Sequence, residues 1–396
     1  MGYRKLVAKL REEVEKRFVG NREAIKGVTL GLLSERSTIL IRGPRGRGKS
    51  TLMLLFLKGI FGDDYVVISG ASEVKRGEVV ARLHLPSLEK EGVERVVWSA
   101  FVKAKGKGID EVNRLNPYTA ANIYHMLQFG EVWAYGKRYL TRDFVLIANE
   151  NPGDPTTFTH PPPFYDRFDV SVYLRSLSLS EKFELQKLLE KTSPVDDMPQ
   201  VLSFEDLKEA REEVAEVELD VEIMGTINVL VRDLQACVRG RDYSPIKPPA
   251  LCEGCHFVRG VCSAIKEGPS ERATVVLTNL AKAKAWLEGK VDVSDIYELA
   301  LLVLPHRMEL VREGLPLAEL REILRREEEI NRERESRGQW FLLDKLLKGF
   351  KADVYRLARE IAMEDLVFAE ELIKLEGKWV KEGAIKPEET LGFEIL

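Results

Sequence analysis

Glycine, lysine and hydroxyl residues in the first quarter of the chain are spaced as in a phosphate-binding loop. The run Gly43-Pro44-Arg45-Gly46-Arg47-Gly48-Lys49-Ser50 fits the pattern GxxxxGK[ST], and Thr51 follows it. In such a loop, glycines turn backbone N–H groups toward a β-phosphate, the lysine reaches the outer phosphates, and the hydroxyl binds Mg²⁺. An apolar β-rich run, 38–41, precedes the loop, and an apolar run with helical character, 52–57, follows it. The sequence therefore predicts that the chain binds a nucleoside triphosphate with Mg²⁺.

An acidic pair further along the chain predicts that the nucleotide is hydrolysed. Asp110 would hold Mg²⁺ through its waters, and Glu111 would polarise the attacking water. The alternative is two surface acids in a loop. A buried parallel strand is normally a continuous apolar run, but residues 101–108 before this pair contain three lysines. We therefore expect either a short strand or lysines that face a cavity.

A polar amide and an arginine complete the candidate site. The apolar strand 144–148 ends in Asn149-Glu150-Asn151-Pro152, where an amide can reach a γ-phosphate and the attacking water. Arg167 follows, in Tyr165-Asp166-Arg167-Phe168-Asp169, and suits a guanidinium finger that enters the site of a neighbouring subunit. Taken alone, Arg167 would more often be a surface ion-pair partner. Its place after the other motifs favours the finger.

In this order, the motifs resemble those of the MoxR branch of the AAA+ ATPases, which is related to magnesium chelatase and to MCM-type motors. The resemblance covers about residues 11–310 and implies an α/β fold, a P-loop αβα core around a parallel sheet. It implies that ATP is bound by an adenine-side motif and the phosphate loop, that is by Phe18, Val19, Gly20, Gly43, Arg45, Gly46, Arg47, Gly48, Lys49, Ser50 and Thr51.

The same resemblance implies roles for single residues in catalysis. Asn151 corresponds best to the sensor-1 polar residue, with Asn149 as the lesser candidate, and Arg272 corresponds to the sensor-2 arginine that touches the γ-phosphate. The expected catalytic residues are Lys49, Glu111, Asn151, Arg167 and Arg272, and the expected Mg²⁺ ligands are Ser50 and Asp110. Arg45 and Arg47 make this loop more charged than is usual in the family.

Two insertions that mark this branch have counterparts here. Residues 69–96 correspond to the helix-2 insert, a hairpin-like excursion that faces the pore of a hexamer. Residues 131–139 independently predict a β-hairpin, because strand-forming residues flank a turn that contains Gly136. This segment corresponds to the pre-sensor-1 hairpin. Its aromatic and basic tip could grip an unfolded peptide or a nucleic-acid strand, and an ordinary amphipathic hairpin is about equally expected.

All four cysteines of the chain, Cys237, Cys252, Cys255 and Cys262, lie within residues 237–262. Cys252-Glu253-Gly254-Cys255 is the tight turn that points two thiolates at one ion, so we expect a metal site. A single CxxC between two lone cysteines favours a [4Fe–4S] cluster, and Zn²⁺ is the alternative. Paired disulfides are less expected in a cytoplasmic protein. The segment is an addition to the family pattern and would staple the lid.

Length and composition indicate several domains and a globular protein. The chain has 396 residues, of which 44% are apolar and 31% charged, with a net charge of −4. Residues 1–175 are expected to form the nucleotide-binding core, 181–310 a helical lid, and 315–396 a C-terminal helical extension. Packing of this extension on the lid is favoured, and a contact with a subunit or partner is the alternative. No run approaches about 18 consecutive apolar residues, and the N-terminus lacks a signal-peptide core. We therefore expect a cytoplasmic protein without membrane contact.

The leading functional expectation is an ATP-hydrolysing remodelling motor. The resemblance implies a homo-oligomeric ring, expected to be a hexamer, with chaperone-like action on a protein client. It also implies partners with von Willebrand A domains and work in protein or metalloenzyme maturation. The alternative is a DNA- or RNA-acting motor with an iron–sulfur cluster, although the net charge of −4 disfavours a general basic surface. A scaffold without turnover is disfavoured because Glu111 and Arg167 are both present.

Overall fold

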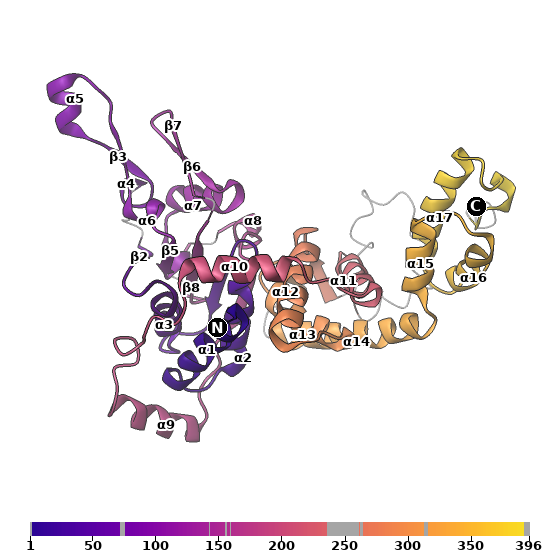
Figure 1. Cartoon of the computed structure of the whole chain (residues 1–396), viewed down its shortest axis with the longest axis horizontal. Coiled ribbons are helices and arrows are strands. Elements are labelled where there is room, and N and C mark those ends of the chain that lie inside the picture. The colour runs from indigo at the N-terminus through magenta and orange to yellow at the C-terminus, as the bar shows by residue number, and fades with distance from the viewer. Residues whose placement is uncertain are drawn as a thin grey trace. The chain divides into compact units, whose positions relative to one another are not determined.

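The computed structural model describes residues 2–71, 76–141, 143–154, 157, 158, 160–235, 261, 264–312 and 316–391 (Figure 1). Two compact units divide the chain. The first comprises 1–217 and 279–291, and the second comprises 218–278 and 292–396. The domain limits expected from the sequence, 1–175, 181–310 and 315–396, stay predictions. Among the described residues, no helix combines the length and apolar character that crossing a membrane requires.

A five-stranded parallel sheet forms the centre of the first unit, in the order β2-β5-β8-β1-β9. Its strands are β1 (Thr38–Arg42), β2 (Tyr65–Ser69), β5 (Gly106–Asp110), β8 (Val145–Glu150) and β9 (Val170–Tyr173). Ile109 of β5 pairs with Ala148 of β8, and Ile41 of β1 pairs with Asn149. The carboxyl ends of these strands therefore meet at one edge, where ligands of parallel sheets bind. The expected α/β core is confirmed.

Helices pack on this sheet. α3 (Lys49–Phe61) contacts β5 and β8, and α2 (Arg22–Leu32) contacts β1 and β9. α7 (Pro117–Phe129) begins after Asn116, whose side chain accepts a hydrogen bond from the backbone N–H of Thr119 and so caps the helix. Further helices of this unit are α1 (Tyr3–Arg17), α8 (Pro162–Tyr165), α9 (Leu179–Leu189), α10 (Phe204–Ala215) and residues 279–288 of α12 (Arg272–Glu288).

Both predicted hairpin-like insertions are present and project from the same side of the first unit (Figure 1). In the helix-2 insert, β3 (Ala81–Leu83) pairs with β4 (Val96–Trp98), and α5 (Leu85–Glu91) forms the tip. The short helices α4 (Arg76–Val79) and α6 (Ala100–Lys103) flank its base. The second hairpin pairs β6 (Glu131–Ala134) with β7 (Lys137–Leu140). Its two-residue turn has φ of 50° at Tyr135 and 69° at Gly136, as a type I′ turn requires.

The second unit is mainly helical. Its helices are α11 (Val221–Leu234), the start of α12, α13 (Val293–Val303), α14 (Pro316–Ser336), α15 (Gln339–Leu347), α16 (Ala352–Ala362) and α17 (Leu366–Lys381). A small antiparallel pair joins β10 (Ile265–Glu267) to β11 (Glu309–Leu310).

The C-terminal extension has its own core and also contacts α11. α15, α16 and α17 pack around a cluster that includes the fully buried Trp379. Trp340 lies against Gly225 of α11, where a Cβ would come within 2.5 Å of the indole ring. The buried Arg334 pairs with Asp233 at 2.8 Å and with Asp365 at 2.7 Å, which ties α14 to the end of α11 and the start of α17. These contacts join the extension to α11, and its assignment as a separate domain on a lid stays a prediction.

Candidate nucleotide-binding site

The phosphate loop adopts a backbone that needs its glycines. Gly46 and Gly48 have φ of 72° and 81°, in the region that glycine tolerates best. A Cβ on Gly48 would also lie 3.0 Å from the ring of Phe18. α3 begins at Lys49, so its N-terminal N–H groups open onto the loop. A helix N-terminus with a glycine-rich loop before it binds phosphate well, because free N–H groups and the helix dipole both favour an anion.

Lys49 lies folded over this loop. Its Nζ donates to the carbonyl oxygen of Gly43 at 2.8 Å and to that of Pro44 at 2.9 Å. Burial lowers the pKa of Lys49, and the nearby Glu111 and Asp110 carboxylates act against this shift. The ammonium is therefore held at the loop by neutral carbonyls, which an anionic phosphate can replace with a stronger, charge-assisted interaction.

The two expected Mg²⁺ ligands lie in direct contact. The Ser50 hydroxyl donates to Oδ1 of Asp110 at 2.7 Å. The side-chain amide of Asn149 donates to the same carboxylate oxygen at 2.6 Å, and its Oδ1 accepts from the backbone N–H of Glu111 at 2.9 Å. A hydroxyl and a carboxylate are the hard oxygen ligands that Mg²⁺ prefers, so this pair fits a site for Mg²⁺ bound together with phosphates.

The backbone at Glu111 is bent away from its strand. Glu111 is not a glycine and yet has a φ of 57°. Gly70, directly after β2, fits against this bend: its N–H donates to the carbonyl oxygen of Asp110 at 2.5 Å, and a Cβ at Gly70 would lie 1.9 Å from the carbonyl oxygen of Glu111. Such backbone conformations gather at functional sites. A role for Gly70 could not be predicted from the sequence, because the register of the sheet decides which residues after β5 it lies against.

A charged cluster that the sequence did not predict joins the phosphate loop to Glu111. Asp154, in the loop after β8, accepts hydrogen bonds from Arg45 of the phosphate loop and from Arg114. Arg114 also pairs with Oε2 of Glu111 at 3.2 Å. The hydrogen bond to Asp154 raises the pKa of Arg45. Arg45, expected to bind ATP, therefore already has a carboxylate partner and reaches Glu111 through two intermediate residues.

The adenine-side motif lies against the phosphate loop and the segment after β9. The ring of Phe18 contacts Gly48, as described above. Gly20 has a φ of 73°, and a Cβ there would lie 2.7 Å from the side chain of Leu177. Asn21 accepts a hydrogen bond from the backbone N–H of Arg175 at 2.8 Å. These contacts hold the segment with Phe18, Val19 and Gly20 beside the loop, although their contact with adenine stays a prediction.

The structure favours Asn149 over Asn151 as the amide at the site. Asn149 is fully buried in β8 and bonds to Asp110 and the backbone of Glu111. Asn151 follows the strand, and its backbone oxygen accepts hydrogen bonds from the Asn113 side chain at 3.1 Å and from the backbone N–H of Asp154 at 3.3 Å. We therefore propose Asn149, the lesser candidate from the sequence, for the sensor role, and the role of Asn151 stays a prediction.

We expect Asn149→Ala to lower kcat for ATP hydrolysis by about 10²-fold, because the amide fixes the carboxylate of Asp110 and the backbone of Glu111. Asn151→Ala should lower kcat by less than about threefold. Steady-state kinetics of the two variants, with circular dichroism to confirm folding, compare them directly. A larger loss in Asn151→Ala than in Asn149→Ala would restore the assignment to Asn151.

The remaining predicted catalytic arginines lie outside this cluster of contacts. Arg167 sits in the turn after α8, where its guanidinium donates to the Tyr124 hydroxyl at 3.2 Å and pairs with Asp166 at 3.1 Å. Its side chain is 17% exposed, so in the single chain it lies on α7 and does not project outward as expected. Arg272 begins α12 in the second unit, and its contact with a γ-phosphate stays a prediction.

The predicted cysteine ligands, Cys237, Cys252, Cys255 and Cys262, lie outside the described residues. α11 ends at Leu234, before this segment, and Ala264 after it accepts a hydrogen bond from the backbone N–H of Val311 at 2.9 Å. In the described part of the chain, no group of three or more His, Cys, Asp or Glu side chains is placed to hold a metal ion. The [4Fe–4S] cluster, like its alternative Zn²⁺, stays a prediction.

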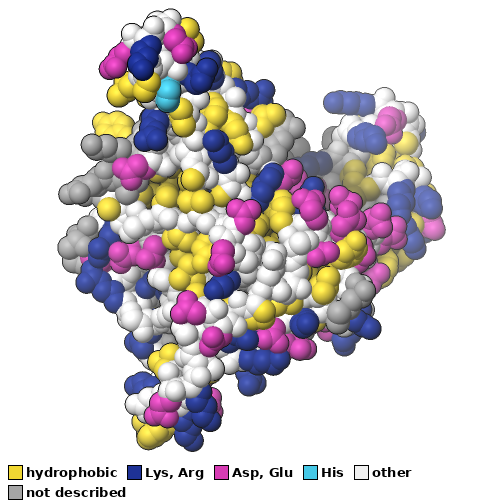
Figure 2. Space-filling view, turned by 60° about the vertical axis from the view of Figure 1, so that its left-hand side comes forward, with side chains coloured by type: hydrophobic (Ala, Val, Ile, Leu, Met, Phe, Trp, Pro, Cys, Tyr) yellow, Lys and Arg dark blue, Asp and Glu magenta, His cyan; other side chains and the backbone are white. Residues whose placement is uncertain are grey.

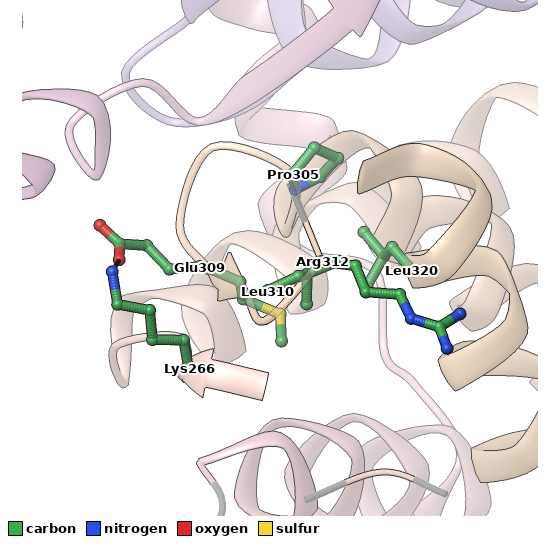
Figure 3. A pocket seen from close by; sticks show the side chains of 7 residues that line it. Lys266, Pro305, Glu309, Leu310, Arg312 and Leu320 are labelled. Carbon is green, nitrogen blue, oxygen red and sulfur yellow. Dashed lines mark ion pairs between the residues drawn. The ribbon is translucent and has the colours of Figure 1, made fainter. Parts of the chain in front are cut away.

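A pocket of about 360 Å³ lies in the second unit. Figure 3 shows Lys266 and Glu309 facing each other on one side and Arg312 on the other, and the two former residues form an ion pair at 2.8 Å. The other lining residues are Pro305, Met308, Leu310 and Leu320. None of the predicted site residues lines this pocket, and it contains no phosphate-binding loop. The loop 43–51 therefore stays the predicted place for the nucleotide.

Comparison with known proteins agrees with this geometry. Residues 38–168 match the AAA domain of the dynein-related subfamily, and residues 260–332 match an AAA lid domain. The uncharacterized protein YeaC of Bacillus subtilis is 25% identical over 309 residues, 76% of this chain and 87% of YeaC. The protein MoxR of Methylorubrum extorquens is 24% identical over 323 residues, 77% of this chain and 88% of MoxR. A crystal structure of a candidate ATPase from Cytophaga hutchinsonii superposes with a TM-score of 0.65 at 22% identity, covering 82% of this chain and 94% of the other.

Proposed function

The chain is an AAA+ ATPase that is similar to MoxR, and from this premise we propose that it works as a homo-oligomeric ring, a hexamer, that remodels a protein client. The observation that carries the proposal is the joint placement of Ser50, Asp110 and Asn149 at one end of the sheet, beside Glu111. This arrangement suits hydrolysis better than passive binding, because two donors fix Asp110 and the adjoining Glu111 supplies a carboxylate that can polarise the attacking water.

Each residue of this site has a separate task in the proposed reaction. The loop N–H groups and Lys49 bind the phosphates of ATP, and Lys49 leaves the carbonyls of Gly43 and Pro44 to do so. Bound between Ser50, Asp110 and the phosphates, Mg²⁺ would neutralise the charge that develops on the phosphate oxygens. Glu111 orients and polarises the attacking water, and Asn149 holds the Asp110 carboxylate and the backbone of Glu111 in place. Arg167 of a neighbouring subunit completes the charge stabilisation.

The surface of the two projecting hairpins favours an unfolded polypeptide as the client. On the β6–β7 hairpin, Trp133 and Tyr135 are 49% and 51% exposed, and at the insert Leu85 is 61% exposed. Figure 2 shows hydrophobic side chains at the upper projection among charged side chains of both signs. Arg138 is paired with Glu131, which reduces the positive charge of the hairpin. Exposed apolar side chains without a net basic surface suit a peptide better than a nucleic acid.

ATPase assays with two kinds of added polymer test this proposal. A permanently unfolded protein should stimulate ATP hydrolysis severalfold, and Trp133→Ala with Tyr135→Ala should remove the stimulation while the basal rate is kept. Tyr118→Ala, an exposed aromatic residue on α7, is the matched control. Strong stimulation by single-stranded DNA that weakens with salt would instead support a nucleic-acid motor. We further propose partners with von Willebrand A domains and a role in metalloenzyme maturation. Identifying the proteins that stay bound to a hydrolysis-deficient variant in the presence of ATP tests both.

A further inference from the structure

Lys107 is an unusual residue for the middle of a central strand. It lies on β5 and is fully buried. Its Nζ donates to the backbone carbonyl oxygens of Phe101, of Val102 at 3.0 Å and of Ala104 at 2.5 Å. The rings of Phe101 and Phe144 lie 5.3 and 5.5 Å from the same nitrogen. The lysine therefore faces a closed shell of carbonyls and aromatic rings, not the open cavity that the sequence left as one alternative.

These carbonyls belong to the C-terminal end of α6. The last carbonyl groups of a helix have no partner within the helix, and leaving one buried without a donor costs about 1–3 kcal/mol. α6 spans Ala100–Lys103, so most of its carbonyls are terminal. An ammonium has three N–H donors and a positive charge, both of which suit the negative end of a helix. Lys107 thus holds α6 to β5.

α6 is also the joint between the helix-2 insert and the acidic pair. Its N-cap, Ser99, directly follows β4 of the insert, and the Ser99 hydroxyl donates to the carbonyl oxygen of Val79 at 2.8 Å. Its C-terminal end is held by Lys107, which lies three residues before Asp110 on the same strand. The chain therefore passes from the insert to the catalytic carboxylates through one helical turn that is fixed at both ends.

We propose that Lys107 is a positioning residue for ATP hydrolysis. It locks α6 to β5, so that a movement of the helix-2 insert is transmitted to Asp110 and Glu111. The lock itself follows from the contacts of Lys107, and the transmission of client binding rests on the proposed function. The residue touches neither nucleotide nor reacting water, so it acts through the strand that carries the two carboxylates.

The charge on Lys107 gives the lock a dependence on pH. Burial, and after it the positive charge of Lys105, lowers the pKa of Lys107 to about 7. Raising the pH from 6 to 9 removes one donor and the charge, so the lock weakens. Because the unfolded chain binds this proton more tightly, Lys107 makes the free energy of unfolding rise with pH between about 7 and 10.5. As the pH rises, deprotonation of Lys107 therefore weakens the lock between α6 and β5, while the free energy of unfolding increases.

The test compares Lys107→Met and Lys107→Arg with Lys103→Met, a control at an exposed lysine of the same segment. We expect Lys107→Met to lower basal kcat about tenfold with KM for ATP changed by less than about twofold, and to remove stimulation by an unfolded protein. Wild type should lose activity as pH rises through about 7. Lys107→Arg should keep its kcat at pH 9, because a guanidinium stays charged.

Three results separate the outcomes. If folded Lys107→Met had the same kcat and the same pH profile as wild type, the proposal would be overturned. If Lys107→Met does not fold by circular dichroism, the pH profiles of wild type and Lys107→Arg decide, and identical profiles would overturn it. If an unfolded protein fails to stimulate wild type while Lys107→Met still lowers kcat at constant KM, the proposed client is wrong and the role of Lys107 stands.

Discussion

Replacing Glu111 with glutamine is expected to lower kcat for ATP hydrolysis by about 10²–10⁴-fold, while ATP binding is kept. Glutamine has the shape of glutamate but cannot accept the proton of the attacking water. The phosphate loop, Ser50 and Asp110 are unchanged, and the hydrogen bond from the backbone N–H of Glu111 to Asn149 does not involve the side chain. Steady-state ATPase kinetics and equilibrium binding of a fluorescent ATP analogue measure the two properties separately.

Glu23→Gln serves as the control, because Glu23 is an exposed carboxylate on α2 in the same unit. It should hydrolyse ATP at the wild-type rate. Glu111→Gln should also hold ATP for longer than one wild-type turnover, which makes it the trap for capturing a client. A Glu111→Gln variant that hydrolyses ATP as fast as wild type would contradict the role of Glu111 as the residue that activates water.

Replacing Arg167 with alanine is expected to lower kcat by about 10³-fold or more with little change in KM for ATP. An arginine that contacts the transferred phosphate contributes mainly in the transition state, so its loss appears in kcat. In the single chain, the guanidinium lies 5.2 Å from the ring centre of Tyr124 and must leave it to reach a neighbouring site. Tyr124→Phe keeps the ring and removes the hydroxyl, and should change kcat by less than about threefold.

A small effect of Arg167→Ala on kcat, together with a loss of folding stability, would show that Arg167 serves the structure of its own chain. Its contacts with Tyr124 and Asp166 would then be its whole role. Thermal unfolding of Arg167→Ala and Tyr124→Phe measured beside the kinetics distinguishes the two cases.

The parts of the site that depend on local sequence could be predicted. The phosphate loop follows from glycines at fixed spacing, since each φ above 0° in the loop falls on a glycine. The β6–β7 hairpin follows from a glycine turn between strand-forming residues, and its turn at Tyr135 and Gly136 has the expected handedness. Such signals involve residues close together in the chain, so no knowledge of sheet register is needed to interpret them.

The contacts that depend on register or on distant segments could not be predicted. Asn149 meets Asp110 because β8 continues to Glu150, further than the apolar run alone indicates. Asp154 joins Arg45 to Arg114 from a loop that has no motif of its own. The sequence predicted a short strand or lysines that face a cavity, whereas the partners of Lys107 are the carbonyls of α6, the helix that follows the insert. In each case, the partner is set by tertiary packing.

Mixing two inactive variants tests most directly whether hydrolysis occurs between subunits. Glu111→Gln and Arg167→Ala chains are unfolded and refolded together, or coexpressed, and the ATPase rate of the mixed assemblies is measured. If the site takes Glu111 from one chain and Arg167 from the next, about a quarter of the sites in a random ring are intact, and activity should return well above the sum of the separate variants. If both residues act within one chain, every site lacks one of them. A mixed assembly as inactive as its components would contradict the account.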